Sequence, residues 1–261
     1  MSELLYLYQY RDVFMIIFVR VMAAIAFLPI IEESKMPRIA LSGLALGIAT
    51  SAFFNMDVTK SYYAPNLVSY SVLLIKEMIV GLILGFVVKL FFQVYPFVGS
   101  LLSMQGGLSM SVVMDPTSGM QATQLGRLYN LGLAVIFIQS GGYHWFIQTL
   151  VESFDLIPIG KAIFTNNITM GMIETMGVYF ELGLKLSMPI VGVILVVDFA
   201  MGILARTVPQ MNMFVIGIPI KMIILFILLI IMMNVTSQFN QIIIEELVQT
   251  VNDVIAGMRG L

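Results

Sequence analysis

Cysteine is absent from this 261-residue sequence, and histidine occurs once, at His144. The absence of cysteine excludes a disulfide scaffold and a thiolate metal site, and a single histidine cannot form a cluster of zinc ligands. The sequence also has no phosphate-binding loop, so we do not expect this chain to hydrolyse ATP by itself. We therefore expect neither a cofactor nor a metal ion.

Charged residues are scarce as well. They make up 11% of the sequence, against 59% hydrophobic residues, whereas a soluble domain carries about 25% charged residues. The net charge is −2 and no basic run occurs, so we expect no nucleic acid among the partners. This composition predicts an all-α polytopic membrane protein surrounded by lipids.

Six apolar segments are candidates for membrane spans, which need about 20 apolar residues each. They are 13–31, 39–54, 67–95, 128–150, 176–204 and 213–236. We expect the first to be a retained helix, because Glu3 and Asp12 stand where a cleaved signal carries basic residues. The uneven lengths indicate helices that are tilted, bent or partly outside the bilayer. Apolar residues at helical spacing in 237–261 predict an amphipathic helix at the end.

Two pairs of glycines lie four residues apart inside these segments: Gly43 with Gly47, and Gly81 with Gly85. Small residues at this spacing let two helices approach closely, so both pairs predict close helix packing. The alternative is coincidence, because glycine is common in membrane helices.

Ionisable residues inside or beside the apolar segments form a second unusual feature. They are Arg20, Lys76, Glu77, Lys89, Glu181, Lys185, Asp198 and Lys221. A charge in the bilayer is costly, so each should pair, reach the interface or face water. Glu181 and Lys185 have the spacing of a pair on one helix face, whereas Lys89 and Lys221, near segment ends, can extend to the interface. Structural ion pairs within a bundle are the simpler interpretation, and a polar pathway is the alternative.

The segment 96–127 is neither a good membrane helix nor an ordinary polar loop. It contains several glycines and only two charged residues, Asp115 and Arg127. Asp115-Pro116 predicts a turn. Its four methionines, whose side chains repack easily, are Met104, Met110, Met114 and Met120. Irregular backbone at membrane depth is tolerated only inside protein or along a cavity, so this segment is a candidate seal for a pore. A loop that only packs is the alternative.

An intramembrane protease is the main enzymatic alternative, and few residues support it. Gly107-Leu-Ser109-Met110 resembles the Gly-x-Ser of rhomboid-like proteases, with His144 as a base one segment later. However, the rhomboid pattern continues with glycine where this chain has Met110. Asp115 and Asp198 could be imagined as an aspartyl pair, but no Gly-x-Gly-Asp motif accompanies them. We therefore expect no enzyme.

Two blocks of residues resemble the FliR family of flagellar type III export-gate proteins. The first is Gln105-Gly-Gly-Leu-Ser, with Asp115-Pro116 downstream. The second is Arg206-Thr-Val-Pro209-Gln210-Met-Asn212-Met-Phe214, followed by Gly217 and Pro219. Gly141-Gly-Tyr-His144 is similar to a glycine and histidine stretch that the family has at the end of a span. Length and segment order match over essentially the whole chain.

The resemblance implies a subunit of a closed export gate in the bacterial inner membrane, within the flagellar basal body. FliP and FliQ would form the gate with this chain, FlhB would associate with it, and unfolded flagellar proteins would pass through. Residues 1–175 would form a FliP-like helical part, and 176–261 a FliQ-like hairpin with the amphipathic tail. Much of the assembly would lie above the membrane plane. The homologous subunit of a virulence injectisome is the nearest alternative, and an autonomous channel a remote one.

The same resemblance assigns roles to residues. A plug of about residues 102–124 would close the pore, with these positions singled out: Met104, Gln105, Gly106, Gly107, Met110, Met114, Asp115, Pro116 and Met120. A turn between the last two helices, with subunit contacts, would comprise Arg206, Pro209, Gln210, Asn212, Phe214, Gly217 and Pro219. There Pro209 would break the helix, and the amides of Gln210 and Asn212 would bond the freed backbone groups.

Overall fold

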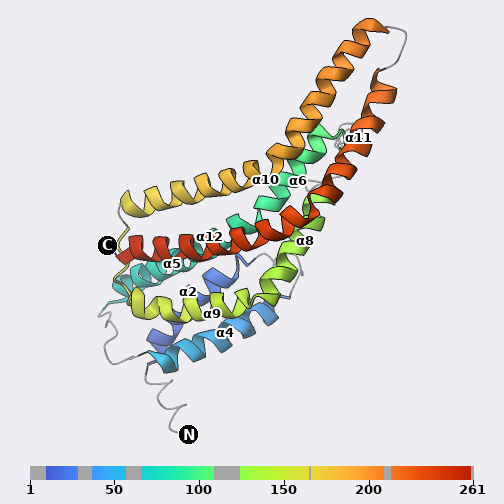
Figure 1. Ribbon diagram of the computed structural model, residues 1–261. Coiled ribbons are helices and arrows are strands. Elements are labelled where there is room, and N and C mark those ends of the chain that lie inside the picture. Colours follow the sequence, from blue (N-terminus) through green and yellow to red (C-terminus); the bar gives the residue numbers. More distant parts are fainter. Residues whose placement is uncertain are drawn as a thin grey trace. The chain divides into compact units, whose positions relative to one another are not determined.

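The computed structural model describes residues 10–28, 37–56, 66–108, 124–164, 166–208 and 213–259, which are helical almost throughout (Figure 1). The helices are α2 (Arg11–Ile25), α4 (Arg38–Asn55), α5 (Leu67–Phe92), α6 (Val94–Gln105), α8 (Gln124–Gln139), α9 (Gly142–Leu156), α10 (Asn166–Thr207), α11 (Met213–Ile231) and α12 (Met233–Arg259). No β-strand occurs within these ranges. The predicted all-α class is therefore confirmed.

Three helical stretches in the described ranges are long and apolar enough to cross a membrane. They are Arg38–Asn55, Leu67–Gln105 and Asn166–Thr207, and the bent pair α11 and α12 adds a fourth if it forms one span. The chain thus has the character of a polytopic membrane protein, with fewer full-length spans than the six predicted segments.

The differences have local causes. Helix α2 ends at Ile25 and has 15 residues, short of a full crossing. The predicted span 128–150 is broken between α8 and α9, because Gly141 adopts φ +74°, a left-handed conformation that ends a helix. The predicted span 213–236 is interrupted at Met232, between α11 and α12.

Helix α12 confirms the amphipathic pattern predicted for the end of the chain. Its buried apolar residues, spaced three and four apart, are Ile243, Leu247, Val251, Val254, Ile255 and Met258. Glu245 and Asp253 lie on the exposed face. The apolar stripe is therefore used within this chain, as helical periodicity predicts.

The described residues divide into two compact units that interleave along the sequence. Unit 1 is drawn from residues 1–91, 137–176 and 246–261, and unit 2 from 92–136 and 177–245. Helices α10 and α12 each contribute residues to both units. This division follows contacts within the chain, whereas the predicted parts 1–175 and 176–261 follow a resemblance to other subunits.

In unit 1, α4 packs against α2 and α9 (Figure 1), with the rings of Phe14 and Phe53 edge to face at 5.9 Å. Helix α5 lies directly on α2 at two glycines. A Cβ at Gly81 would collide with the carbonyl oxygen of Arg20, and one at Gly85 with the carbonyl of Ala24. The predicted close packing is confirmed for this pair.

The other predicted pair of small residues behaves differently. Within the described chain, no atom lies within 4 Å of a Cβ built at Gly43 or Gly47 in α4. Their spacing therefore serves no close helix contact among the described residues, so the predicted packing is not found there.

In unit 2, two aromatic residues of α6 join the surrounding helices. Tyr95 stacks on Tyr129 of α8 with ring centroids 5.5 Å apart, and its hydroxyl donates a hydrogen bond to the Asn240 side chain of α12. Phe97 packs against Tyr179 and Phe180 of α10. Because α6 is anchored on three sides, its C-terminal end has a defined place in the unit.

Candidate functional site

The first candidate region is the C-terminal end of α6, where the predicted plug begins. The Gly106 amide donates to the Leu102 carbonyl at 2.8 Å, and Gly107 then turns the chain with φ +79°. This conformation is costly for residues with a Cβ and easy for glycine. Met104 is 62% exposed, and Gln105 is half-buried.

Of the predicted plug, residues 102–108 and 124 are described, and we call Met104 to Gly107 the base of the predicted plug. The remaining predicted plug residues lie outside the described ranges; they are Met110, Met114, Asp115, Pro116 and Met120. Their roles stay predictions.

Helix α11 packs directly on the two glycines at the base. A Cβ at Gly106 would collide with the side chain of Leu225, and one at Gly107 would lie 3.3 Å from Ile218 Cγ2. Residues seven apart lie on one helix face, so Ile218 and Leu225 form a single contact surface. Leu225 is fully buried. The absence of a side chain at both positions lets α11 lie this close to the end of α6.

Lys221 lies on the same face of α11, between those two residues, and forms an ion pair with Asp198 of α10. The Lys221 side chain is 24% exposed and that of Asp198 is 35% exposed. The expectation that Lys221 simply extends to the interface was wrong, because it pairs across helices. The sequence contained a signal for this pairing. Asp198 and Lys221 lie at nearly equal distances along the chain from the α10–α11 connection, so they face each other if the two helices form a hairpin.

A cavity of about 370 Å³ adjoins this pair. Its lining comes from the end of α6 (Met104, Gln105, Gly107), from α10 (Asp198, Met201, Gly202, Ala205) and from α11 (Gly217, Ile218, Lys221). The walls are mostly apolar, with the ion pair and one amide as polar groups. The base of the predicted plug, the ion pair and the cavity thus form one site within unit 2.

The residues predicted to form the turn between the last two helices are only partly described. Arg206 is exposed in the last turn of α10, where a cation complements the helix dipole. Gly217 is buried in α11, with Met201 Cε 3.0 Å from a Cβ built there, and Pro219 lies inside α11. Pro209, Gln210, Asn212 and the Phe214 side chain lie outside the described residues.

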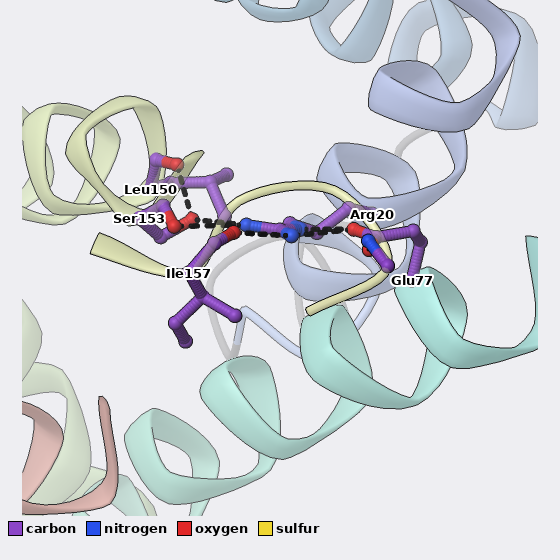
Figure 2. Close-up of polar contacts among 6 residues, drawn as sticks. Arg20, Glu77, Leu150, Ser153 and Ile157 are labelled. Atoms are coloured by element: carbon purple, nitrogen blue, oxygen red, sulfur yellow. Dashed lines mark hydrogen bonds and ion pairs between the residues drawn. The ribbon is translucent and has the colours of Figure 1, made fainter. Parts of the chain in front are cut away.

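Unit 1 contains a second charge pair, Arg20 of α2 with Glu77 of α5 (Figure 2). Arg20 Nε donates to Glu77 Oε2 at 2.6 Å, and both side chains are 0% exposed. Arg20 also donates to the carbonyl oxygens of Ser153 and Ile157, at 3.0 and 2.9 Å, and to the Ser153 hydroxyl. Carbonyls at a helix end need such partners, so Arg20 caps the end of α9.

The second carboxylate oxygen of Glu77 has a partner of its own. Glu77 Oε1 accepts a hydrogen bond from the Gly160 amide at 2.9 Å. Gly160 adopts φ +78°, and a Cβ there would lie 2.6 Å from Leu73 Cδ1. Arg20 also lies over the Phe154 ring, 4.2 Å from its centre. The pair and its partners therefore join α2, α5, α9 and the loop after α9. Burial of two charges is tolerated when such hydrogen bonds compensate both of them.

Sequence reasoning identified Arg20 and Glu77 but missed their partners. A backbone carbonyl carries no residue-specific signal, so Ser153 and Ile157 could not be read from the sequence. Gly160 was detectable only as a turn residue after Pro158.

The remaining charges are less organised. Glu181 and Lys185 form the ion pair that their spacing predicted, at 2.5 Å, with side chains 59% and 62% exposed. Lys89 lies over the Phe27 ring, and Lys76 is half-buried in α5.

Among the described residues, no group of three or more acidic or histidine side chains could hold a metal. His144 is exposed in α9, and Ser109, its partner in the protease hypothesis, lies outside the described residues.

Comparison with known proteins identifies the family. Residues 12–247 match the family model of the bacterial export proteins, family 1. The flagellar biosynthetic protein FliR of Bacillus subtilis is 28% identical over 93% of this chain and 94% of its own length. FliR of Escherichia coli is 28% identical over 91% of this chain and 90% of its own. The surface presentation of antigens protein SpaR of Shigella flexneri is 29% identical over 78% of each chain. Because the family model matches nearly the whole sequence, this chain belongs to the bacterial export proteins of family 1, the FliR family.

Proposed function

We propose that this chain is a subunit of a type III protein export gate in the bacterial inner membrane, at the flagellar basal body. The observation that carries the proposal is the family match over residues 12–247. The long apolar helices fit a place in a membrane. Its partners are FliP- and FliQ-like subunits and FlhB, and its cargo is unfolded flagellar proteins. It has no enzymatic role, and energy for export comes from its partners or the proton motive force.

Within this gate, the segment of about residues 102–124 is the plug. The end of α6 at two tightly packed glycines supports this assignment, as does the cavity beside Met104 and Gln105. Residues 1–175 act as the FliP-like part and 176–261 as the FliQ-like part. The hairpin of α10 and α11, held by Asp198 and Lys221, is the feature of unit 2 that fits a FliQ-like role.

A virulence injectisome is the second candidate setting, because SpaR of Shigella flexneri is also similar to this chain. The flagellar setting is favoured because two flagellar relatives, FliR of Bacillus subtilis and of Escherichia coli, match this chain over 94% and 90% of their length, against 78% for this SpaR.

The first experiment removes the chain from its host and restores it from a plasmid. We expect export of flagellar proteins into the medium to stop and then to return, measured by mass spectrometry of the culture supernatant. Loss of virulence effectors with intact flagellar export would place the chain in an injectisome. Normal export of both would contradict the proposed function.

The second experiment tests the plug. The chain is co-expressed with its FliP- and FliQ-like partners, either intact or lacking residues 106–119, and dye entry into the cells is measured. The shortened chain should assemble and let dye through, while the intact complex stays tight. If the assembled deletion stays equally tight, the segment only packs and the seal lies elsewhere.

A further inference from the structure

We propose that the ion pair between Asp198 and Lys221 is a latch that holds α11 against the base of the plug and so keeps the gate shut. The proposal rests on the proposed function and adds to it the residues that maintain the closed state. It concerns unit 2 alone.

Lys221 lies in the middle of the face of α11 that meets the base of the plug. Ile218 precedes it by three residues and Leu225 follows it by four, which places all three side chains on one helix face. The two apolar residues pack against Gly107 and Gly106, while the lysine between them binds Asp198. The ion pair therefore acts at the centre of the contact between α11 and the base of the plug.

The ion pair between Asp198 and Lys221 has room to separate. Both side chains are partly exposed and line a cavity of about 370 Å³. Lys221 thus has space to move without creating a void in a packed core. The Gln105 amide in the same lining can hydrogen-bond one charge when the pair is apart. A fully buried pair has no such space, and separating it leaves uncompensated charges inside the protein, so it cannot serve as a switch at comparable cost.

Helix α11 contains a proline beside the ion pair, where its backbone hydrogen bonding is interrupted. Pro219 has no backbone N–H, so the Val215 carbonyl lacks its usual partner within the helix. Helices bend at such positions. Gly217, two residues earlier, gives the same turn further freedom. When the ion pair separates, α11 can bend here and withdraw Ile218 from Gly107.

The test measures dye or ion leak per assembled complex in cells that express the chain with its FliP- and FliQ-like partners. Asp198→Asn and Lys221→Met each remove one charge and keep the approximate size of the side chain. We expect leak to rise about fivefold, the effect that a partly exposed ion pair can exert on a two-state equilibrium. Exchanging the charges, as Asp198→Lys with Lys221→Asp, should restore most of the seal.

Glu181 and Lys185 supply the matched control. They form an ion pair on the same helix α10, exposed and confined to one helix. The double variant Glu181→Gln with Lys185→Gln should assemble and stay as tight as the intact chain. An equal leak in this variant would mean that loss of any charge on α10 is sufficient, which would overturn the latch.

A covalent version tests the same idea without relying on charge. The chain has no native cysteine, so Asp198→Cys with Lys221→Cys introduces the only two thiols. A short, cleavable cross-linker with two thiol-reactive electrophilic groups, joining the two cysteines, should keep the complex tight and block export. Cleaving the linker should make the gate leaky and restore export. Because the cross-link itself shows that the hairpin has formed, this variant also decides the question if the single variants fail to assemble.

Failure of the latch differs from failure of the proposed function. If the deletion of 106–119 leaks but Asp198→Asn and Lys221→Met assemble and stay tight, the plug stands and the latch is overturned. The latch is also overturned if the charge exchange leaks as much as the single variants, or if cross-linking leaves export unchanged. If the assembled deletion is tight as well, the plug itself is contradicted.

Discussion

Arg20–Glu77 in unit 1 and Asp198–Lys221 in unit 2 are both pairs of a cation with a carboxylate, but their surroundings differ. The first is fully buried, and its charges also bind two carbonyls, a hydroxyl and an amide. The second is partly exposed and lines a cavity. A buried charge pair with hydrogen-bond partners on all sides holds the helices that carry it together. A charge pair beside a cavity can open and form again. Unit 1 is thus joined by a pair that has no room to separate, whereas the pair in unit 2 lies beside a cavity.

The largest expected effect is on unit 1. Replacing Glu77 by Leu leaves the Arg20 charge buried without its partner, which costs about 3–5 kcal/mol in comparable cases. We expect a corresponding loss in the free energy of unfolding in detergent. Adding Arg20→Met should recover part of it, because the uncompensated charge is removed while the Ile157 carbonyl and the Gly160 amide lose their side-chain partners. If Glu77→Leu alone were as stable as the intact chain, the pair would not support unit 1.

The second prediction compares the two glycine pairs. In Gly81→Ala the new methyl group meets the backbone carbonyl of Arg20, and we expect a loss of about 1–3 kcal/mol from overpacking. Gly43→Ala is the control, because that position has open space in the described chain. It should stabilise α4 by up to about 1 kcal/mol through helix propensity. Thermal unfolding of the two variants in detergent checks the difference, and equal effects would refute the packing of α5 on α2.

The third prediction concerns the base of the plug. Gly107→Ala forces a residue with a Cβ into a left-handed conformation, at a cost of about 1–2 kcal/mol. Gly107→Asn introduces a Cβ at the same place but tolerates that conformation better. We therefore expect the alanine variant to be the less stable of the two in detergent. The opposite order would show that contact with Ile218, and not backbone strain, requires glycine at this position.

The smallest stability effects are expected from the two less buried pairs. Lys221→Met should lower the free energy of unfolding by at most about 1 kcal/mol, because partly exposed ion pairs contribute little. Lys185→Gln should change it by about 0.5 kcal/mol or less. A loss in Lys221→Met as large as that in Glu77→Leu would remove the distinction between the two units.

Features that depend on composition or local spacing could be predicted from the sequence. The all-α membrane class follows from the apolar composition, the contact at Gly81 and Gly85 from the four-residue spacing, and the pair of Glu181 and Lys185 from one helix turn. The same spacing failed at Gly43 and Gly47, because a small residue permits a close contact but does not supply the second helix.

Contacts between helices that are far apart in the sequence could not be predicted from it. Arg20 was recognised as a charge that needs a partner, but the carbonyls of Ser153 and Ile157 became partners only through the packing of α9. Lys221 was interpreted by its position near a segment end, and its partner emerged only from the antiparallel pairing of α10 and α11. The break at Gly141 has a local turn signal in Ser140-Gly141-Gly142, but the apolar segments before and after it favoured one continuous span.

One measurement tests the division of roles between the two units most directly: leak per assembled complex in Lys221→Met, beside that in Glu77→Leu. The account predicts that Lys221→Met assembles in normal amounts and leaks, because the contact of α11 with the plug base is released. It predicts that Glu77→Leu assembles in smaller amounts, while each assembled complex stays as tight as the intact one. Leak in Glu77→Leu together with a tight Lys221→Met would contradict the account.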